Sequence, residues 1–182
     1  MRRTTTRVLL SCAAIGVGGG LVAGASGYLA AAFAAFGPLF YGVTVGAHFL
    51  PSIVALALLK RPGTAVLAGV IAGLVGAVFA PWWIGRFVGT GLLVGALVEL
   101  PFLITGYRRW QPWMFYIAAV FSGVVLAVAV FFALGAEHYT PWAWAIALPL
   151  WVLSPVLFTW IGRLIAARLA RAGVAQAGAD AS

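Results

Sequence analysis

Glu99 is the one acidic side chain inside an apolar stretch of this chain. It lies in the segment Phe87–Thr105, which is apolar on both sides of it. The other two acids, Glu137 and Asp180, fall outside the apolar runs. Placing a carboxylate in hydrocarbon costs at least ~2.5 kcal/mol on insertion scales. We therefore expect Glu99 to face a bundle interior and to meet a ligand, a cation or a proton there.

Other polar and aromatic residues are expected near Glu99. At ~1.5 Å per residue, Glu99 lies about 18 Å below the outer end of its helix, near the midplane. His48 and Trp151 reach a similar depth in their own apolar runs. The residues expected above them are Tyr41, Thr44, Thr90, Phe132 and Trp144. Together they predict an aromatic-lined cavity that opens outward with a carboxylate at its floor, the usual makeup of a small-ligand site.

Each of these residues also has a structural interpretation. Glu99 could pair with His48 or with a backbone group, and His48 could be a packing histidine. The tryptophans are individually typical of anchors at the membrane interface, although Trp151 lies too deep for that role. The two histidines, His48 and His138, lie on different segments and predict no metal site.

The composition indicates an all-α integral membrane protein. Of the 182 residues, 64% are hydrophobic and 8% are charged, and apolar stretches of about 18 residues or more recur along the whole length. The net charge of +8 comes from basic residues at the ends of these stretches, so it indicates topology rather than binding to nucleic acid. Cys12 is the only cysteine, which excludes an internal disulfide and a cysteine-based metal centre.

Six spans fit this pattern and form one domain over residues 1–171, followed by a disordered cytoplasmic tail over residues 172–182. Phe36-Gly37-Pro38, Arg61-Pro62-Gly63, Pro81 and Pro141 disfavour continuation of a helix between neighbouring spans. The predicted spans are Val8–Tyr28, Pro38–Leu59, Thr64–Phe79, Phe87–Thr105, Trp113–Leu134 and Trp142–Ile165.

The basic residues predict the orientation of this six-helix bundle in the cell membrane. With both termini in the cytoplasm, only Arg86 lies outside, and the other basic groups between or beside spans lie inside. Those inner residues are Arg2, Arg3, Arg7, Lys60, Arg61, Arg108, Arg109, Arg163, Arg168 and Arg171. The tryptophans then expected at the outer interface, in contact with lipid headgroups, are Trp82, Trp83, Trp142 and Trp144.

Glycines recur four residues apart in several spans, and this spacing lets helices approach closely in lipid. For most of these pairs we expect packing inside the bundle. The first span is the exception, because its glycine face, Gly16, Gly20 and Gly24, could contact a partner subunit.

The motifs of common catalytic and nucleotide sites are missing. Gly16–Gly20 is rich in glycine, but no Gly-Lys-Ser/Thr follows it, so it does not form a phosphate-binding loop. Neither a serine-hydrolase elbow nor a His-Glu-x-x-His zinc motif occurs. We therefore expect no enzyme and no cofactor, and energy for active transport would come from another chain or an ion gradient.

Three blocks of sequence resemble the YkoE family, over about Phe36 to Phe132. They are Lys60-Arg61-Pro62-Gly63-Thr64-Ala65, the Gly91-x-x-x-Gly95-x-x-x-Glu99 helix and Tyr107-Arg108-Arg109-Trp110, with Phe36-Gly37-Pro38-Leu39 and Tyr41-Gly42-Val43 upstream. Members of this family are substrate-binding S components of energy-coupling-factor (ECF) ABC transporters, associated with thiamine or its hydroxymethylpyrimidine (HMP) precursor.

The resemblance implies a six-helix S component that captures a vitamin outside. It would dock through its first helix on a transmembrane coupling (T) subunit driven by two ATPase subunits. Glu99 matches the glutamate of the family's fourth helix. Where the family carries a glutamine in that helix, this chain has Val94, and where it carries acids in the third helix, this chain has Gly69 and Gly76. These departures favour a ligand less cationic than thiamine, or a different one.

Two other functions remain open at this point. The first is an intramembrane enzyme that uses Glu99 as an acid or base, and it is weakened by the lack of a second carboxylate or a nucleophile nearby. The second is a structural or assembly protein whose glycine faces pack against other membrane chains. Substitution of Glu99 distinguishes a structural protein from a transport subunit, because a transport subunit would lose its ligand without losing assembly.

Overall fold

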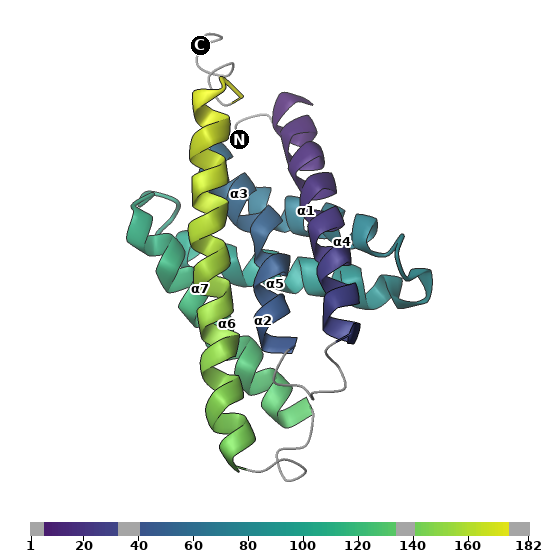
Figure 1. Ribbon diagram of the computed structural model, residues 1–182. Helices are drawn as coiled ribbons and strands as arrows, with labels where there is room; N and C mark the ends of the chain where they lie inside the picture. The colour runs from purple at the N-terminus through teal and green to yellow at the C-terminus, as the bar shows by residue number, and fades with distance from the viewer. Residues whose placement is uncertain (1–5, 33–40, 134–140, 175–182) are drawn as a thin grey trace.

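The computed structural model describes residues 6–32, 41–133 and 141–174, and the regular structure in these ranges is entirely helical. In chain order the helices are α1 (Thr6–Ala32), α2 (Tyr41–Val45), the 3-10 helix η2 (Gly46–Phe49), α3 (Leu50–Leu59), α4 (Thr64–Gly76), the 3-10 helix η3 (Pro81–Trp83), α5 (Ile84–Ile104), α6 (Pro112–Ala133) and α7 (Pro141–Arg171). Figure 1 shows that α1 begins and α7 ends at the same end of the bundle.

Five helical segments of the described chain are long and apolar enough to cross a membrane, namely α1, α2–α3, η3–α5, α6 and α7. This confirms the prediction of an all-α, multi-pass membrane protein. The predicted third span, Thr64–Phe79, corresponds to α4, which is shorter. Its 13 residues make a helix about 20 Å long, against the ~30 Å of a bilayer's hydrocarbon core. The predicted tail lies largely outside the described residues, which end at 174.

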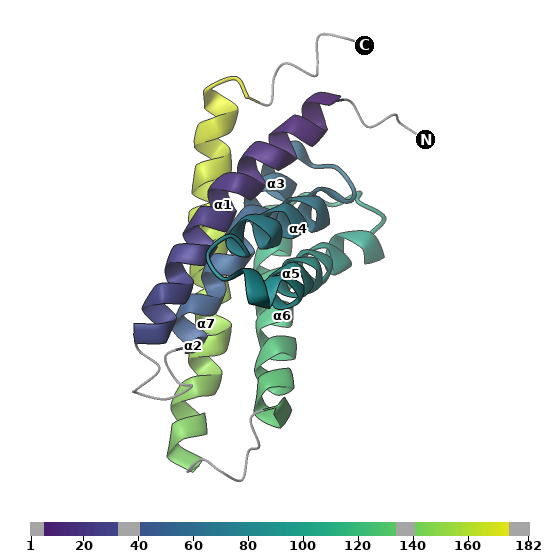
Figure 2. The same ribbon diagram turned by 90° about the vertical axis from the view of Figure 1, so that its right-hand side faces the viewer.

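The α2–α3 segment lies at the centre of the bundle. In the window Gly42–Leu59, 67% of the residues are buried, whereas the corresponding value is 33% for each of the other four spans. Its side chains Phe49, Ile53 and Leu56 belong to the main core cluster, together with Phe102 of α5 and Phe115 of α6. Figure 2 shows α4 and α5 between α1 and α6.

The central segment changes from α-helix to 3-10 helix over Gly46–Phe49 for two local reasons. Pro51 has no N–H to donate to the carbonyl of Ala47, and the N–H of Leu50 donates to that carbonyl instead. Ser154 of α7 contacts the same stretch, because its hydroxyl accepts from the N–H of Gly46 at 3.0 Å and donates to the carbonyl of Val43 at 2.7 Å. His48 is therefore held on an irregular turn fixed to α7.

Glycines join α4 and α5 backbone to backbone. A Cβ built on Gly69 or on Gly91 would collide with the carbonyl oxygen of the other glycine, and one on Gly95 would lie 2.7 Å from the Cα of Val66. In lipid, where helix association depends on van der Waals packing, such contacts hold helices together. The two helices therefore form a close antiparallel pair, and the prediction that most four-residue glycine repeats pack inside the bundle is confirmed for this pair.

Candidate functional site

A pocket of about 550 Å³ opens between α1, the α2–η2 segment and the chain that joins α4 to α5. Its lining comes from the second half of α1, from α2–η2 and from the start of α5, and Figure 1 shows that α1 ends and α2 begins away from the end of the bundle where α7 finishes. Its volume is typical of small-molecule sites. The described residues that line it are Gly24, Ser26, Gly27, Tyr28, Thr44, His48, Phe79, Ala80, Trp82, Trp83, Arg86, Phe87 and Thr90.

The pocket exists because α4 is short. It ends at Gly76, and tight turns carry the chain through Phe79 to η3 while α1 continues alongside. Gly24 of α1 leaves room for the Phe79 ring, which a Cβ at that position would strike. Phe79 then packs edge-on against Tyr28, with ring centroids 6.0 Å apart at 81°. Phe79 and Tyr28 thus form an aromatic wall of the pocket in the space beyond the end of α4.

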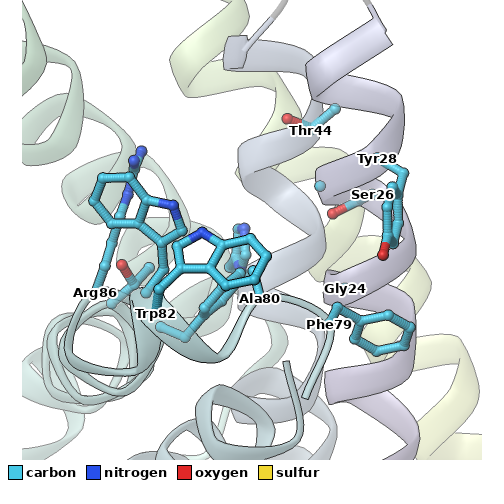
Figure 3. Close-up of a pocket in the computed structure, with 13 residues that line it drawn as sticks. Gly24, Ser26, Tyr28, Thr44, Phe79, Ala80, Trp82 and Arg86 are labelled. Atoms are coloured by element: carbon cyan, nitrogen blue, oxygen red, sulfur yellow. The ribbon is translucent and has the colours of Figure 1, made fainter. Parts of the chain in front are cut away.

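Among the described residues, uncharged groups and one cation supply the polar lining. Figure 3 shows Ser26, Tyr28 and Thr44 on one side of the pocket and Trp82 and Arg86 on the other. The Ser26 hydroxyl donates to the carbonyl of Ala23 at 2.7 Å, so its oxygen can accept from a ligand. The Arg86 guanidinium lies over the Trp83 ring, 5.5 Å from its centroid. Such a site suits a flat ligand that stacks on rings and hydrogen-bonds at its edge.

Three of the predicted site residues, Thr44, His48 and Thr90, meet in this pocket, but Glu99 does not line it. Glu99 lies nine residues beyond Thr90 along α5, which is about 14 Å of helix. The expected position of the carboxylate at the floor of the pocket is corrected accordingly.

The Glu99 carboxylate instead binds the first turn of α4. The N–H of Gly63 donates to Oε1, the N–H of Val66 donates to Oε2 at 3.4 Å, and the Tyr107 hydroxyl donates to Oε1 at 3.1 Å. Glu99 is 4% exposed. Because the first N–H groups of a helix have no partner within the helix and carry partial positive charge, a carboxylate there is stabilising. This geometry favours the interpretation of Glu99 as the partner of a backbone group.

A left-handed turn after α5 brings Tyr107 back to Glu99. Gly106 has φ +60° and Tyr107 has φ +55°, and the N–H of Tyr107 donates to the carbonyl of Phe102 at 2.8 Å. Burial, and then the charge and hydrogen bond of Glu99, raise the pKa of Tyr107 to about 12. Tyr107 therefore stays protonated as a donor at neutral pH.

Three of the remaining predicted aromatic residues do not line the pocket. Trp144 packs against Phe131 with centroids 4.7 Å apart, and Trp151 is buried against Gly42, where a Cβ would lie 2.8 Å from the indole. Phe132 is 76% exposed, on the outside of α6. The side chain of Tyr41 lies outside the described part of the structure.

The glycine face of α1 points into the bundle. A Cβ on Gly16 would lie 2.7 Å from Ile71, one on Gly20 would lie 2.7 Å from the carbonyl oxygen of Ala72, and one on Gly24 would strike Phe79. All three glycines thus pack against α4 or the chain that follows it. This placement corrects the expectation that they face a coupling subunit.

Sequence reasoning missed the α4–α5 connection as a wall of the site. Trp82 and Trp83 were expected to be interface anchors, and Arg86 to be the one basic residue outside. A signal was present, because two adjacent tryptophans and an isolated arginine follow Pro81 within one short stretch. What the sequence does not show is that α4 stops early enough for this stretch to fold over a pocket.

Comparison with known proteins agrees with this architecture. The profile of the family described as the permease component of ABC-type cobalt transport systems matches residues 7–125. A candidate HMP/thiamine permease protein of Bacillus subtilis (strain 168), YkoE, is 26% identical over 140 residues, which is 76% of this chain and 70% of that relative. The predicted resemblance to YkoE is thereby confirmed.

A solved structure shows the same fold. The crystal structure of an S component of an ECF transporter matches with a TM-score of 0.86 and 22% identity, over 96% of this chain and 90% of that chain. The family profile covers more than half of the residues. The chain therefore belongs to the family of permease components of ABC-type cobalt transport systems.

Proposed function

We propose that the chain is the substrate-capture subunit of an ECF-type importer and that it binds thiamine, HMP or another small vitamin-like ligand from the outer face. The observation that carries this proposal is the pocket of about 550 Å³, whose described lining includes five aromatic residues and several uncharged polar groups. The fold of an S component and the similarity to a protein named as an HMP/thiamine permease support the class of function and of ligand.

The basic residues support an outward-facing pocket. Lys60 and Arg61 follow α3, and the loop they begin is bound by Glu99 near the end of α5. Arg163, in the last third of α7, lies 5.8 Å from the Phe115 ring in the first turn of α6, so these two parts lie together. Because positively charged loops stay in the cytoplasm, the pocket at the opposite end of the bundle faces outside.

Partners of this subunit would be a T subunit and two ATPase subunits. Because Gly16, Gly20 and Gly24 face the inside of the bundle, we assign the contact with the T subunit to the other face of α1. That face borders an apolar groove of about 590 Å³, between α1, α3 and the end of α7. Gly18 lies in the groove, and a Cβ there would meet nothing within 4 Å. A transmembrane helix of a partner could therefore approach α1 closely at this point.

Equilibrium binding to the purified chain in lipid nanodiscs tests the proposal. We expect thiamine or HMP to bind the chain without its partners. Thr90→Leu fills the pocket and removes a hydroxyl, so it should weaken binding at least about tenfold, or ~1.4 kcal/mol. Leu93→Ala is the matched control, because Leu93 is an exposed residue of the same helix that does not line the pocket. Equal effects of the two substitutions, or binding of neither compound below about millimolar, would reject the proposed site or ligand class.

A further inference from the structure

The imidazole of His48 lines the pocket and has no hydrogen-bond partner among the described residues. The residue is half-buried, and no described donor or acceptor binds either of its ring nitrogens. Among the described side chains, only the Thr159 hydroxyl is both fully enclosed and without a partner. The ring nitrogens of His48 are therefore open to the surrounding space.

The larger open space beside the ring is the pocket. His48 also borders a second cavity of about 10 Å³, whose other described walls are apolar side chains and glycines. This volume holds about one water molecule at most. Two of its walls, Gly69 and Gly91, are in backbone contact with each other. A partner larger than a water molecule therefore reaches His48 only from the pocket.

The backbone holds His48 in a fixed position. His48 belongs to the 3-10 turn Gly46–Phe49, and Ser154 of α7 binds the start of this turn through Gly46 and Val43, at 3.0 and 2.7 Å. The two neighbours of His48 in the turn are buried. A recognition group on a fixed backbone loses little freedom when it binds a ligand, so more of the energy of its hydrogen bond appears as affinity.

Acceptors for the N–H groups of a ligand are scarce in the pocket. The carboxylate expected there, Glu99, accepts from Gly63 and Val66 and does not line the pocket. The indoles of the lining only donate. The acceptors that remain among the described side chains are hydroxyl oxygens and the bare nitrogen of a neutral His48 imidazole. The imidazole nitrogen is the more basic of these, and it is the stronger acceptor.

We propose that His48 is a specificity-determining residue of the pocket, and that its bare ring nitrogen accepts a hydrogen bond from an exocyclic amine of a heteroaromatic ligand. The inference rests on the proposed function and deepens it, because HMP and thiamine carry the same amine on the same pyrimidine ring. A ligand without the amine displaces water from the nitrogen of His48 and leaves it without a partner, which is unfavourable. The pocket therefore selects for aminated rings, by at least about fivefold.

Titrations of the full chain in lipid nanodiscs with three probes test this role. The probes are HMP, thiamine and an HMP analogue in which a methyl group of similar size replaces the exocyclic amine. The wild type should bind HMP at least about fivefold more tightly than the methyl analogue. His48→Leu keeps a side chain of similar volume but removes its hydrogen bonding, so it should bring this ratio close to one. It should weaken the binding of HMP and thiamine by the same factor, because the two compounds share the amine.

Three other variants make the result specific to the ring nitrogen. His48→Gln offers a carbonyl acceptor and should keep a ratio of at least about threefold. Ser26→Ala removes another acceptor of the lining and should keep the full ratio. Leu93→Ala, on the exposed face of α5, should leave the ratio unchanged as well. Thermal unfolding of each variant shows whether it is folded.

Nitrogen-15 NMR gives a second measurement that does not need a folded variant of His48. The chain has two histidines, so in His138→Gln with labelled histidine the imidazole signals belong to His48. Addition of HMP should shift the signal of the bare nitrogen, as expected for a nitrogen that gains a donor. The methyl analogue brings no donor and should shift it much less.

The outcomes separate this inference from the proposed function. A wild type that binds the methyl analogue as tightly as HMP overturns the inference, while the capture of a vitamin-like ligand stands. So does a preference that survives in His48→Leu, or a His48 signal that HMP leaves unmoved. Loss of the preference in Ser26→Ala alone also overturns it and places the amine on that hydroxyl. If none of the three probes binds the wild type, the ligand class of the proposed function fails and the inference fails with it.

Discussion

The start of α5 lines the pocket, whereas Glu99 near its end holds the first turn of α4. Substitution of Glu99 tests this difference in role most sharply. The carboxylate accepts hydrogen bonds from the N–H of Gly63 just before α4, from the N–H of Val66 in its first turn and from the Tyr107 hydroxyl. None of these groups lines the pocket. We therefore expect Glu99→Ala to lower the stability of the fold and Glu99→Gln to lower it less. Ligand affinity should stay within about twofold for the folded protein, because sites this far apart usually behave independently.

The magnitude follows from the three contacts. A hydrogen bond to a charged acceptor contributes ~1.5–3 kcal/mol, and a neutral one about half of that. The bond from Val66 is long at 3.4 Å, so one strong and two weaker bonds give a loss of ~3 kcal/mol for Glu99→Ala. For a chain of this length, that corresponds to a fall in Tm of about 6–12 °C. Glu99→Gln can still accept one N–H, and we expect about half of this fall.

Cys12 provides the assay. It is the only cysteine of the chain and it is fully buried at 0% exposure, so a thiol-reactive dye reports unfolding on heating. The matched control is Ser122→Ala, which removes a buried hydroxyl that donates to the carbonyl of Ala118 of the same helix at 2.6 Å. This change should cost ~1 kcal/mol or less. An unchanged Tm in Glu99→Gln together with a tenfold or greater loss of ligand affinity, about 1.4 kcal/mol, would refute the reasoning and place the carboxylate on the ligand.

Three further predictions address packing, pH and topology. Gly20→Leu should lower the yield of folded protein, because Gly20 is in contact with α4, whereas Gly18→Leu on the open face should fold normally and weaken assembly with the T subunit, as measured by co-purification. The pKa of Tyr107 is raised from 10.0 to about 12, so the contribution of Tyr107 to stability is complete below pH 10 and is lost as the pH rises through 12. The difference in Tm between the wild type and Tyr107→Phe should therefore shrink between pH 10 and pH 12. A constant difference would contradict this prediction. A cysteine at Arg61 should react only with reagents that reach the cytoplasm and one at Arg86 only from outside, and reversed labelling would invert the orientation and close the pocket to external ligand.

The sequence predicts the helices well because length, apolar content and breakers are local properties. Turn chemistry at Arg61-Pro62-Gly63 marks the end of α3, whereas Pro81 comes five residues after the last residue of α4. Glycine spacing predicts packing inside the bundle, which is found between α4 and α5. The faces of the helices are harder to predict. In lipid both the buried and the exposed face are apolar, so hydrophobic periodicity does not reveal which side faces the core. Gly16 and Gly18 illustrate this, because they lie two residues apart and only the first is buried.

The position of Glu99 relative to the pocket could not be predicted for a related reason. A depth estimate assumes that every helix spans the membrane, but α4 is too short to do so. At one end its first turn meets Glu99, and at the other its early stop leaves space for Phe79 and Trp82 to line a pocket. Trp151, which the depth estimate places level with Glu99, consequently contacts other residues.

A structure of the chain with its ligand bound tests the central claim most directly. The account predicts density for a single ring system between Thr44, Thr90 and the α4–α5 connection, with Trp82 or Phe87 against the ring and Glu99 still bound to α4. Density against Glu99 or Trp151, with the pocket empty, would contradict it.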